Sequence, residues 1–400
     1  MIEIRTLQDP TRYLTRRSFL RATGAAVCTV GAARLAFAGT PIAHAAPNRR
    51  RYAYVGCYTS VERNGRGEGI SVYEIAGNDQ WNLLQVLPTV ENPSYLIADN
   101  AGRTVYSVHG DGNLVSFYRI DAVTGRLSTL GQHDSGGTNG VHIALSPDER
   151  FAIVANYASG SIAVFPRDDS GSLSPRAQLL QLAGTPGPVA SDQKGPQPHE
   201  VSFDALGTHI LVPDKGTDRV HRLSYDPQTG AIAVLGDPVL TPAGAGPRHL
   251  AYHPTLPMLY LVDELSFELT SYHYDPHTAE LSPAQVMPTL PADFTGTSTA
   301  AEIAMSADGR FVYVSNRGHD SIAAFGITPS GALVAPAFAS SGGQQPRFMT
   351  FNPEGRTLYA ANQKSDTIVG LTLDPTTGAL HRSGLQVHTG TPSSITFVDL

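Results

Sequence analysis

The chain has 400 residues, of which 41% are hydrophobic and 16% charged, with 39 glycines and 29 prolines. That composition is typical of a globular protein rich in turns, with ample apolar surface to bury. A formal net charge of −7 argues against nucleic acid as a partner, because surfaces that bind nucleic acid are basic.

The first 45 residues have the pattern of a twin-arginine export signal. The pair Arg16-Arg17 precedes a mildly apolar stretch from Ala22 to Ala38, and Ala43–Ala45 fits a cleavage site of small residues. Arg34 interrupts this stretch, which is shorter than the roughly 20 apolar residues that a membrane-spanning helix requires. We therefore expect export by the twin-arginine machinery to the periplasm or the medium, no stable membrane insertion, and a folded domain over residues 46–400.

Removal of this leader changes the charge and the cysteine content of the rest of the chain. The leader has six arginines against Glu3 and Asp9, so its loss moves the net charge from −7 to −11. It also contains Cys28, so that Cys57 remains as the single cysteine. An intrachain disulfide is then excluded in spite of export to an oxidising compartment.

A pattern of strand, turn and strand recurs along the rest of the chain at spacings of 46 to 58 residues. Each copy opens at an apolar residue: Leu96, Ile143, Val201, Leu250, Ile303, Met349 and Ile395. Ten residues later stand Tyr106, Ile153, Leu211, Tyr260, Tyr313 and Tyr359 in the first six copies. Turns such as Ser146–Arg150 and Ser306–Arg310 predict hairpins, and runs such as Ser161–Phe165 predict third strands before a weaker fourth. Four antiparallel strands at this spacing are typical of propeller blades.

The two ends of the chain complete one further copy. Tyr52–Tyr58 has the pattern of a second strand that lacks its first strand, and Ser393–Val398 that of a first strand with no blade after it. The sequence therefore predicts an all-β, seven-bladed β-propeller, closed by the C-terminal strand joining the N-terminal blade. Such closure removes exposed sheet edges and holds both ends of the domain.

Charged residues gather at one predicted rim of the ring. Because the first two strands of a blade are antiparallel, residues just before each opening position should lie near those fourteen residues after it. The residues two positions before or fourteen positions after an opening residue include His199, Arg248, Arg347, Lys215, Glu264 and Arg317. The residues one position before an opening residue include His142, Glu200, His249 and Glu302. Arginines hold carboxylates, phosphates and developing oxyanions, while a histidine or a glutamate can move a proton. The pattern leaves open whether His199 or Glu264 is the base.

Other polar positions favour structural roles or exclude other sites. Thirteen residues after the opening position, Asn156, Asp214, Asp263, Asn316 and Asn362 are expected to bond turn amides, and strand ends also commonly carry salt bridges between blades. The chain has no His-Glu-x-x-His, no cysteine pair, no EF-hand loop and no Gly-x-Ser-x-Gly. We therefore expect no metal and no cofactor.

Over residues 52 to 400 the chain resembles the β-propeller lactonases, which include the bacterial propeller-type 6-phosphogluconolactonase and the fungal carboxy-cis,cis-muconate lactonising enzyme. The resemblance rests on Tyr54–Thr59, Asn92–Tyr95, Val154–Tyr157, Pro198–Glu200, Val212–Asp218, Gly246–Leu250, Asp263–Leu265, Val314–Asp320 and Gln345–Arg347. It implies catalytic roles for His199, Arg248, Glu264 and Arg317 in the hydrolysis of a sugar lactone by water. The remaining rim residues, Arg347, Lys215, His249, Glu302, His142 and Glu200, are expected to bind the substrate.

Three functions fit this site. The first is a lactonase, with 6-phosphogluconolactonase-like activity on a small anionic lactone or sugar acid. The second is a muconate-type lactonising cycloisomerase that uses the same proton chemistry. The third is a propeller without catalysis that binds a ligand or a protein.

Overall fold

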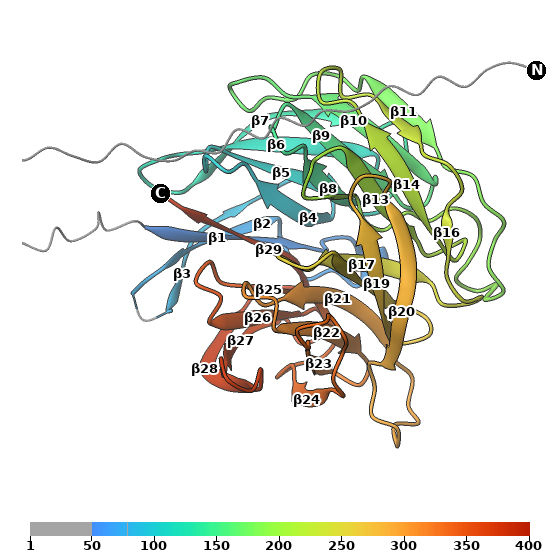
Figure 1. The fold of residues 1–400 in the computed structure, drawn as a ribbon. Coiled ribbons are helices and arrows are strands. Elements are labelled where there is room, and N and C mark those ends of the chain that lie inside the picture. Colours follow the sequence, from blue (N-terminus) through green and yellow to red (C-terminus); the bar gives the residue numbers. More distant parts are fainter. Residues whose placement is uncertain (1–49, 78) are drawn as a thin grey trace, which may run out of the picture. The chain divides into compact units, whose positions relative to one another are not determined.

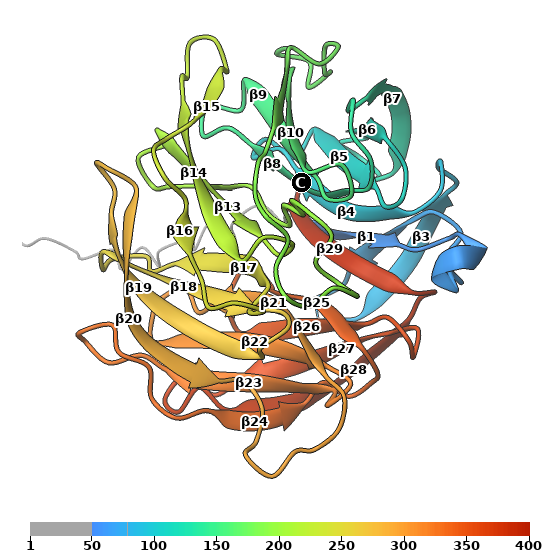
Figure 2. The same cartoon turned by 90° about the vertical axis from the view of Figure 1, so that its right-hand side faces the viewer.

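The computed structural model describes residues 50–77 and 79–400. The predicted export signal, residues 1–45, lies outside the described residues. Seven antiparallel sheets follow one another around a ring, and we number them as blades 1 to 7 (Figures 1 and 2). The predicted all-β, seven-bladed propeller is confirmed. No helix in the described part is long and apolar enough to cross a membrane.

The strands of the first four blades are as follows. Blade 1 contains β29 (Pro392–Asp399), β1 (Arg51–Cys57), β2 (Ile70–Ile75) and β3 (Trp81–Leu87), with the short 3-10 helix η1 (Val61–Arg63) after β1. Blade 2 contains β4 (Pro93–Ala98), β5 (Thr104–His109), β6 (Leu114–Ile120) and β7 (Leu127–Asp134). Blade 3 contains β8 (Gly140–Leu145), β9 (Phe151–Asn156), β10 (Ser161–Pro166) and β11 (Gln178–Gln181). Blade 4 contains β12 (Ser202–Phe203), β13 (His209–Asp214), β14 (Arg219–Tyr225) and β15 (Ile232–Val234), with β16 (Val239–Leu240) also paired to β14.

The last three blades have four strands each. Blade 5 contains β17 (Pro247–Tyr252), β18 (Met258–Asp263), β19 (Glu268–Asp275) and β20 (Glu280–Pro288). Blade 6 contains β21 (Thr299–Met305), β22 (Phe311–Arg317), β23 (Ser321–Gly326) and β24 (Ala337–Ser340). Blade 7 contains β25 (Pro346–Phe351), β26 (Thr357–Asn362), β27 (Thr367–Leu373) and β28 (Leu380–His388). The first strands of blades 5, 6, 7, 1, 2 and 3 contact one another in that order, and in blade 4 the second strand, β13, contacts β17 of blade 5.

A recurring tyrosine joins each of several blades to the next one. In the second strands of blades 1, 2, 5 and 6, a buried tyrosine donates its hydroxyl to a glycine carbonyl of the following blade. The pairs are Tyr54 with Gly125, Tyr106 with Gly171, Tyr260 with Gly331, and Tyr313 with Gly378. Each of these glycines has a positive φ, and a Cβ on Gly125 would lie 2.3 Å from the ring of Tyr52. The tyrosine found ten residues into a copy is therefore a contact between blades.

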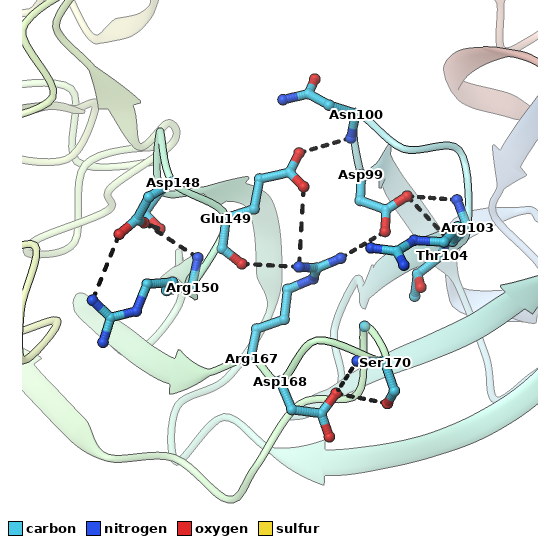
Figure 3. Close-up of polar contacts among 12 residues, drawn as sticks. Asp99, Asn100, Arg103, Thr104, Asp148, Glu149, Arg150, Arg167, Asp168 and Ser170 are labelled. Atoms are coloured by element: carbon cyan, nitrogen blue, oxygen red, sulfur yellow. Dashed lines mark hydrogen bonds and ion pairs between the residues drawn. The ribbon is translucent and has the colours of Figure 1, made fainter.

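Salt bridges also join neighbouring blades on the side of the ring where the first two strands are connected. Figure 3 shows Arg167, which follows β10 in blade 3, beside Asp99 in the β4–β5 turn of blade 2. Their closest atoms, Nη2 and Oδ2, lie 2.6 Å apart, and both side chains are buried. Arg167 also donates to the carbonyl of Glu149, and the Glu149 carboxylate accepts from the Asn100 amide. These charges satisfy one another and hold two blades together.

The ring closes as predicted, because β29 pairs with β1 from Arg51 opposite Asp399 to Cys57 opposite Pro392. Arg51 donates to both carboxylate oxygens of Asp399, from Nε at 2.6 Å and from Nη2 at 2.8 Å. A two-point contact of this kind fixes the last strand more firmly than a single ion pair.

We expect Arg51→Ala to lower the free energy of unfolding by about 1 kcal/mol, since the pair is largely shielded from solvent but still near the surface. Urea unfolding of Arg51→Ala, Asp399→Ala and the double variant measures the coupling between the two side chains. Arg126→Ala, which removes an exposed arginine, is the control. Additive losses in the double variant would contradict this role for the pair.

Candidate active site

The first strands share a distortion that turns side chains toward one end of the ring. In blades 1, 2, 3, 5 and 7, the pairing between first and second strand skips one residue of the first strand. The skipped residues are Ser393, Ser94, Val141, Arg248 and Arg347. Such a β-bulge leaves its extra residue outside the ladder and re-aims the side chain. All five of these residues line one pocket.

Two adjoining pockets, which together we call the site pocket, occupy this end of the ring. The first is lined by Tyr58, Ser94, Tyr95, Val141, His199, Arg248, His249, Glu302, Arg347, Phe348 and Ser393. The second has a volume of about 180 Å³ and is lined by Tyr58, Arg63, Asn139, Val141, Tyr157, His199, Lys215, Glu264, Arg317 and Arg347. Blades 4 to 7 thus supply the ionisable predicted residues His199, Lys215, Arg248, Glu264, His249, Glu302, Arg317 and Arg347.

A buried carboxylate, that of Glu264, lies among three cations in the site pocket. Its Oε1 is 2.9 Å from Lys215 Nζ, and its Oε2 is 3.0 Å from Arg248 Nε and 3.2 Å from Arg317 Nη2. Burial favours the neutral acid, but Arg317, Lys215 and Arg248 overcome it and hold the pKa of Glu264 well below its usual value. Glu264 is therefore a fixed anion that positions the three cationic side chains.

A chain of three side chains crosses the first part of the site pocket. His199 Nδ1 lies 3.0 Å from His249 Nε2, and His249 Nδ1 lies 2.8 Å from Glu302 Oε1. Burial lowers the pKa of His199 well below its usual value, and the nearby Arg248 lowers it further. Burial also lowers the pKa of His249, although Glu302 opposes this shift. Both imidazoles are therefore neutral near pH 7.

Two arginines retain capacity to bind a ligand. Among the described residues Arg347 forms no ion pair, and its guanidinium lies 5.3 Å from the ring centre of Tyr58. Arg317 donates from Nη2 to the carbonyl of Ala300, but its buried Nε–H has no acceptor within the described part of the protein. An unsatisfied donor costs free energy when it is buried, and a ligand oxygen would satisfy this one.

A sequence model of the family described as "Lactonase, 7-bladed beta-propeller" matches residues 52–397. The chain belongs to the seven-bladed β-propeller lactonase family. It is therefore a lactonase, a hydrolase of cyclic carboxylic esters, as its sequence predicts.

Relatives and solved structures resemble the chain over most of its length. A 6-phosphogluconolactonase of Bacillus subtilis is 33% identical over 332 residues, which cover 82% of this chain and 92% of the relative. A 6-phosphogluconolactonase of Formosa agariphila is 28% identical over 348 residues, which cover 82% and 94%. The structure of a periplasmic gluconolactonase from Pseudomonas aeruginosa has a TM-score of 0.80 and 32% identity, and the match covers 87% of this chain and 99% of that one.

Two of the predicted substrate-binding residues lie outside the lining of the site pocket in this lactonase. His142 stacks on Tyr95 with ring centres 4.4 Å apart, and its Nδ1 accepts from the Val201 amide. Glu200 accepts from the Leu250 amide, and burial raises its pKa to about 8. Both side chains are buried, and neither is among the residues that line the site pocket.

Some lining residues of the lactonase were not singled out from the sequence. Tyr157 occupies the position fourteen residues after Ile143, so the register itself contained a signal for it. Arg63 lies in η1, outside the repeat, and pairs with Asp111. Asp192, in the loop before β12, lies 3.5 Å from Lys215 Nζ and supplies a further anion beside the pocket.

The predicted turn-binding residues differ in what they contact. Asp214 accepts from the amides of Gln197 and Gly216, as expected. The same prediction is wrong for Asp263, because neither of its buried carboxyl oxygens accepts a hydrogen bond of normal geometry in the described chain. Burial, with Glu268 and Asp218 nearby, raises the pKa of Asp263 well above its usual value. Asp263 is therefore a neutral acid.

The three asparagines at this position also contact groups other than turn amides. Asn156 donates to the Ser161 hydroxyl, Asn316 to the Thr289 carbonyl, and Asn362 to the Ser341 carbonyl. Their roles are structural, as predicted, but their partners are hydroxyl and carbonyl groups. In the described chain, no group of three or more His, Cys, Asp or Glu side chains is placed to hold a metal ion.

Proposed function

We propose that this lactonase hydrolyses the lactone of a sugar acid in the site pocket, with His199 as the general base. The observation that carries this proposal is that a neutral imidazole, His199, lines the same pocket as Arg317, whose buried Nε–H has no acceptor among the described residues. Lactone hydrolysis needs a proton acceptor for the attacking water and a donor for the developing oxyanion. His199 and Arg317 are the two groups of the site pocket that we assign to these roles.

The reaction follows from these positions. Water loses a proton to His199 as its oxygen bonds to the lactone carbonyl carbon, and the carbonyl oxygen becomes an oxyanion that Arg317 and Arg248 stabilise. Collapse of this intermediate breaks the bond between the carbonyl carbon and the ring oxygen. The ring oxygen takes up the proton from His199, and the product is an open-chain hydroxy acid.

Glu264 is a weaker candidate for the base than His199. Both of its oxygens contact cations, and these cations hold its pKa well below the usual value. Protonation of Glu264 would remove the anion that the three cations share, whereas a proton on His199 Nε2 would break no hydrogen bond or ion pair of the described residues. We therefore assign Glu264 to the positioning of Lys215, Arg248 and Arg317.

The substrate that we propose is 6-phosphogluconolactone or a related aldonolactone. Arg347 is placed to bind a phosphate or the new carboxylate, because it lines both parts of the site pocket and has no carboxylate partner within the described residues. The two relatives described as 6-phosphogluconolactonases and the neighbour described as a gluconolactonase support this class of substrate.

A pH-stat assay with purified protein tests this function. We expect acid release from δ-gluconolactone or its 6-phosphate above the rate of spontaneous hydrolysis, and none from a muconate. Turnover of the muconate alone would favour a lactonising cycloisomerase. No turnover of any of the three compounds would contradict the proposal and favour a propeller that only binds ligands.

We propose as well that residues 1–45 direct export by the twin-arginine machinery. The support is the order of the twin arginines, the apolar stretch and the small-residue site in the sequence. The Pseudomonas aeruginosa neighbour is itself described as periplasmic.

A further inference from the structure

His199 has to accept a proton at a place where positive charge is unfavourable. Burial is the largest cause that lowers the pKa of His199, and the positive charges of Arg248, Arg347 and Lys215 lower it further. The second imidazole, His249, is close to Arg248 as well. A cationic ring would add to this repulsion.

We propose that His199, His249 and Glu302 form a proton relay in which the Glu302 carboxylate receives the proton, so that neither ring becomes a cation. The inference rests on the proposed function of the site pocket. Three consecutive blades supply the three side chains, and each link has the length of a hydrogen bond, 3.0 Å and 2.8 Å. His249 and Glu302 act through His199 and are positioning residues.

In the resting enzyme, the hydrogen bonds between His199, His249 and Glu302 determine which nitrogen of each histidine carries the proton. An ionised Glu302 can only accept, so His249 carries its proton on Nδ1. His249 Nε2 then carries no proton, and its lone pair accepts a hydrogen bond from His199 Nδ1–H. His199 Nε2 is left without a proton, and it makes no hydrogen bond within the described part of the chain. This nitrogen is the one available to an attacking water.

Four ionisable groups lie near His249 and Glu302. Glu200 is the other carboxyl nearby, and because burial raises its pKa to about 8 it retains its proton at neutral pH. Arg248 supplies a positive charge close to Glu302, and Tyr95 remains a neutral phenol because burial raises its pKa. His142, which faces His249, is neutral because burial lowers its pKa. We therefore assign the negative charge of the relay to Glu302, beside which Arg248 is the cation.

The relay moves one proton and leaves no uncompensated charge. The O–H bond of water breaks and its proton bonds to His199 Nε2. The Nδ1 proton of His199 passes to His249 Nε2, and the Nδ1 proton of His249 passes to Glu302 Oε1. Both rings are neutral before and after the step. Reversal of the three transfers protonates the ring oxygen that leaves the carbonyl carbon.

Nitrogen NMR of the wild-type enzyme, labelled with 15N in its histidines, tests the direction of the chain. At pH 7 we expect both His199 and His249 to be neutral and protonated on Nδ1, with signals assigned by their loss in His199→Gln and His249→Gln. A proton on Nε2 of either ring, or a cationic ring, would overturn the proposal. This measurement does not depend on turnover, so it separates failure of the relay from failure of the proposed function.

Glu302→Gln tests the terminal acceptor. Its amide oxygen can still accept from His249, but the side chain can no longer take the proton, so kcat should fall by about 10²-fold with little change in KM. The acidic midpoint of the profile of kcat/KM against pH should move to lower pH, because loss of the anion makes protonation of the chain harder. Glu302→Asp should restore part of the rate.

A variant elsewhere in the ring separates the relay from loss of any buried histidine. His109 is buried, bonds Ser116 and the Glu91 carbonyl, and lines neither part of the site pocket. We expect His109→Gln to keep the wild-type midpoint. Two results for a folded Glu302→Gln enzyme would overturn the relay. One is an unchanged acidic midpoint in the profile of kcat/KM against pH, and the other is a raised KM with an unchanged kcat.

Discussion

Glu264→Gln should lower the free energy of unfolding by about 3–5 kcal/mol and abolish lactone turnover, although it leaves the shape of the side chain almost unchanged. The carboxylate is the shared partner of Lys215, Arg248 and Arg317 at 2.9 to 3.2 Å. A neutral amide would leave three buried cations facing one another. Denaturant unfolding at pH 7 and the pH-stat assay measure the two effects.

The dependence of this loss on pH is also fixed by the direction of the pKa shift. The pKa of Glu264 is depressed in the folded protein, so its ionised form stabilises the fold at any pH above the ordinary glutamate pKa of about 4.3. That contribution declines only as the pH falls further toward the folded value. The difference in stability between wild type and Glu264→Gln should therefore be constant from pH 7 to about pH 5 and shrink below pH 4.

Glu354→Gln is the matched control for this prediction. Glu354 also pairs with an arginine, Arg51, but the pair lies at the surface and away from the site pocket. Its loss should cost no more than about 1 kcal/mol and leave turnover unchanged. A Glu264→Gln enzyme as stable and active as Glu354→Gln would show that the three cations do not depend on the carboxylate.

The sequence predicts the ring well because the repeat is enforced by packing. Buried second strands such as Phe151–Asn156 need apolar residues over most of their length. The tyrosine ten residues into a copy donates a hydrogen bond to a glycine carbonyl in the next blade, as Tyr313 does to Gly378. These requirements recur in several blades, so they leave a register that can be found in one sequence. The sequence also predicts the closing pair, because Tyr52–Tyr58 has no first strand before it and Ser393–Val398 has no second strand after it.

The sequence predicts the residues of the site less completely than the ring, because counting positions from each opening residue assumes strands without bulges. A regular strand directs successive side chains to opposite faces, but the bulges at Arg248 and Arg347 allow adjacent residues to face the same pocket. Arg248 and His249 accordingly both line the pocket, whereas Glu200 lines neither part of it and accepts from the Leu250 amide. Loops outside the repeat, which supply Arg63 and Asp192, have no register from which to predict their positions.

The proposed choice of His199 over Glu264 as the base depends on the structure. The sequence placed His199 and Glu264 at the same rim without their partners. Three cations surround Glu264 and depress its pKa, whereas burial keeps the His199 imidazole neutral. The chemistry of each group is thus decided by neighbours from other blades, which one sequence does not identify.

Arg317→Ala should lower kcat by about 10²-fold or more, while a more modest change in KM is expected. The guanidinium is anchored by the Ala300 carbonyl and by Glu264, and this leaves the buried Nε–H as the donor without a partner in the described chain. A donor held in place before the reaction stabilises the oxyanion mainly in the transition state, so its loss appears in kcat. Steady-state kinetics on the preferred lactone measure both constants.

Two further variants separate the geometry of this donor from its charge. Arg317→Lys keeps the positive charge beside Glu264 but has no Nε–H in the same place, so we expect it to remain folded and to stay at least about tenfold below the wild-type kcat. Arg347→Ala removes a cation that holds no carboxylate within the described residues, and it should raise KM for an anionic substrate more than it lowers kcat. Arg317 and Arg347 line the same part of the site pocket. A fall in kcat for Arg347→Ala with none for Arg317→Ala would therefore assign the oxyanion to Arg347 and the anionic group of the substrate to Arg317. Wild-type kcat in both Arg317 variants would place the oxyanion elsewhere, with Arg248 as the remaining donor that Glu264 positions.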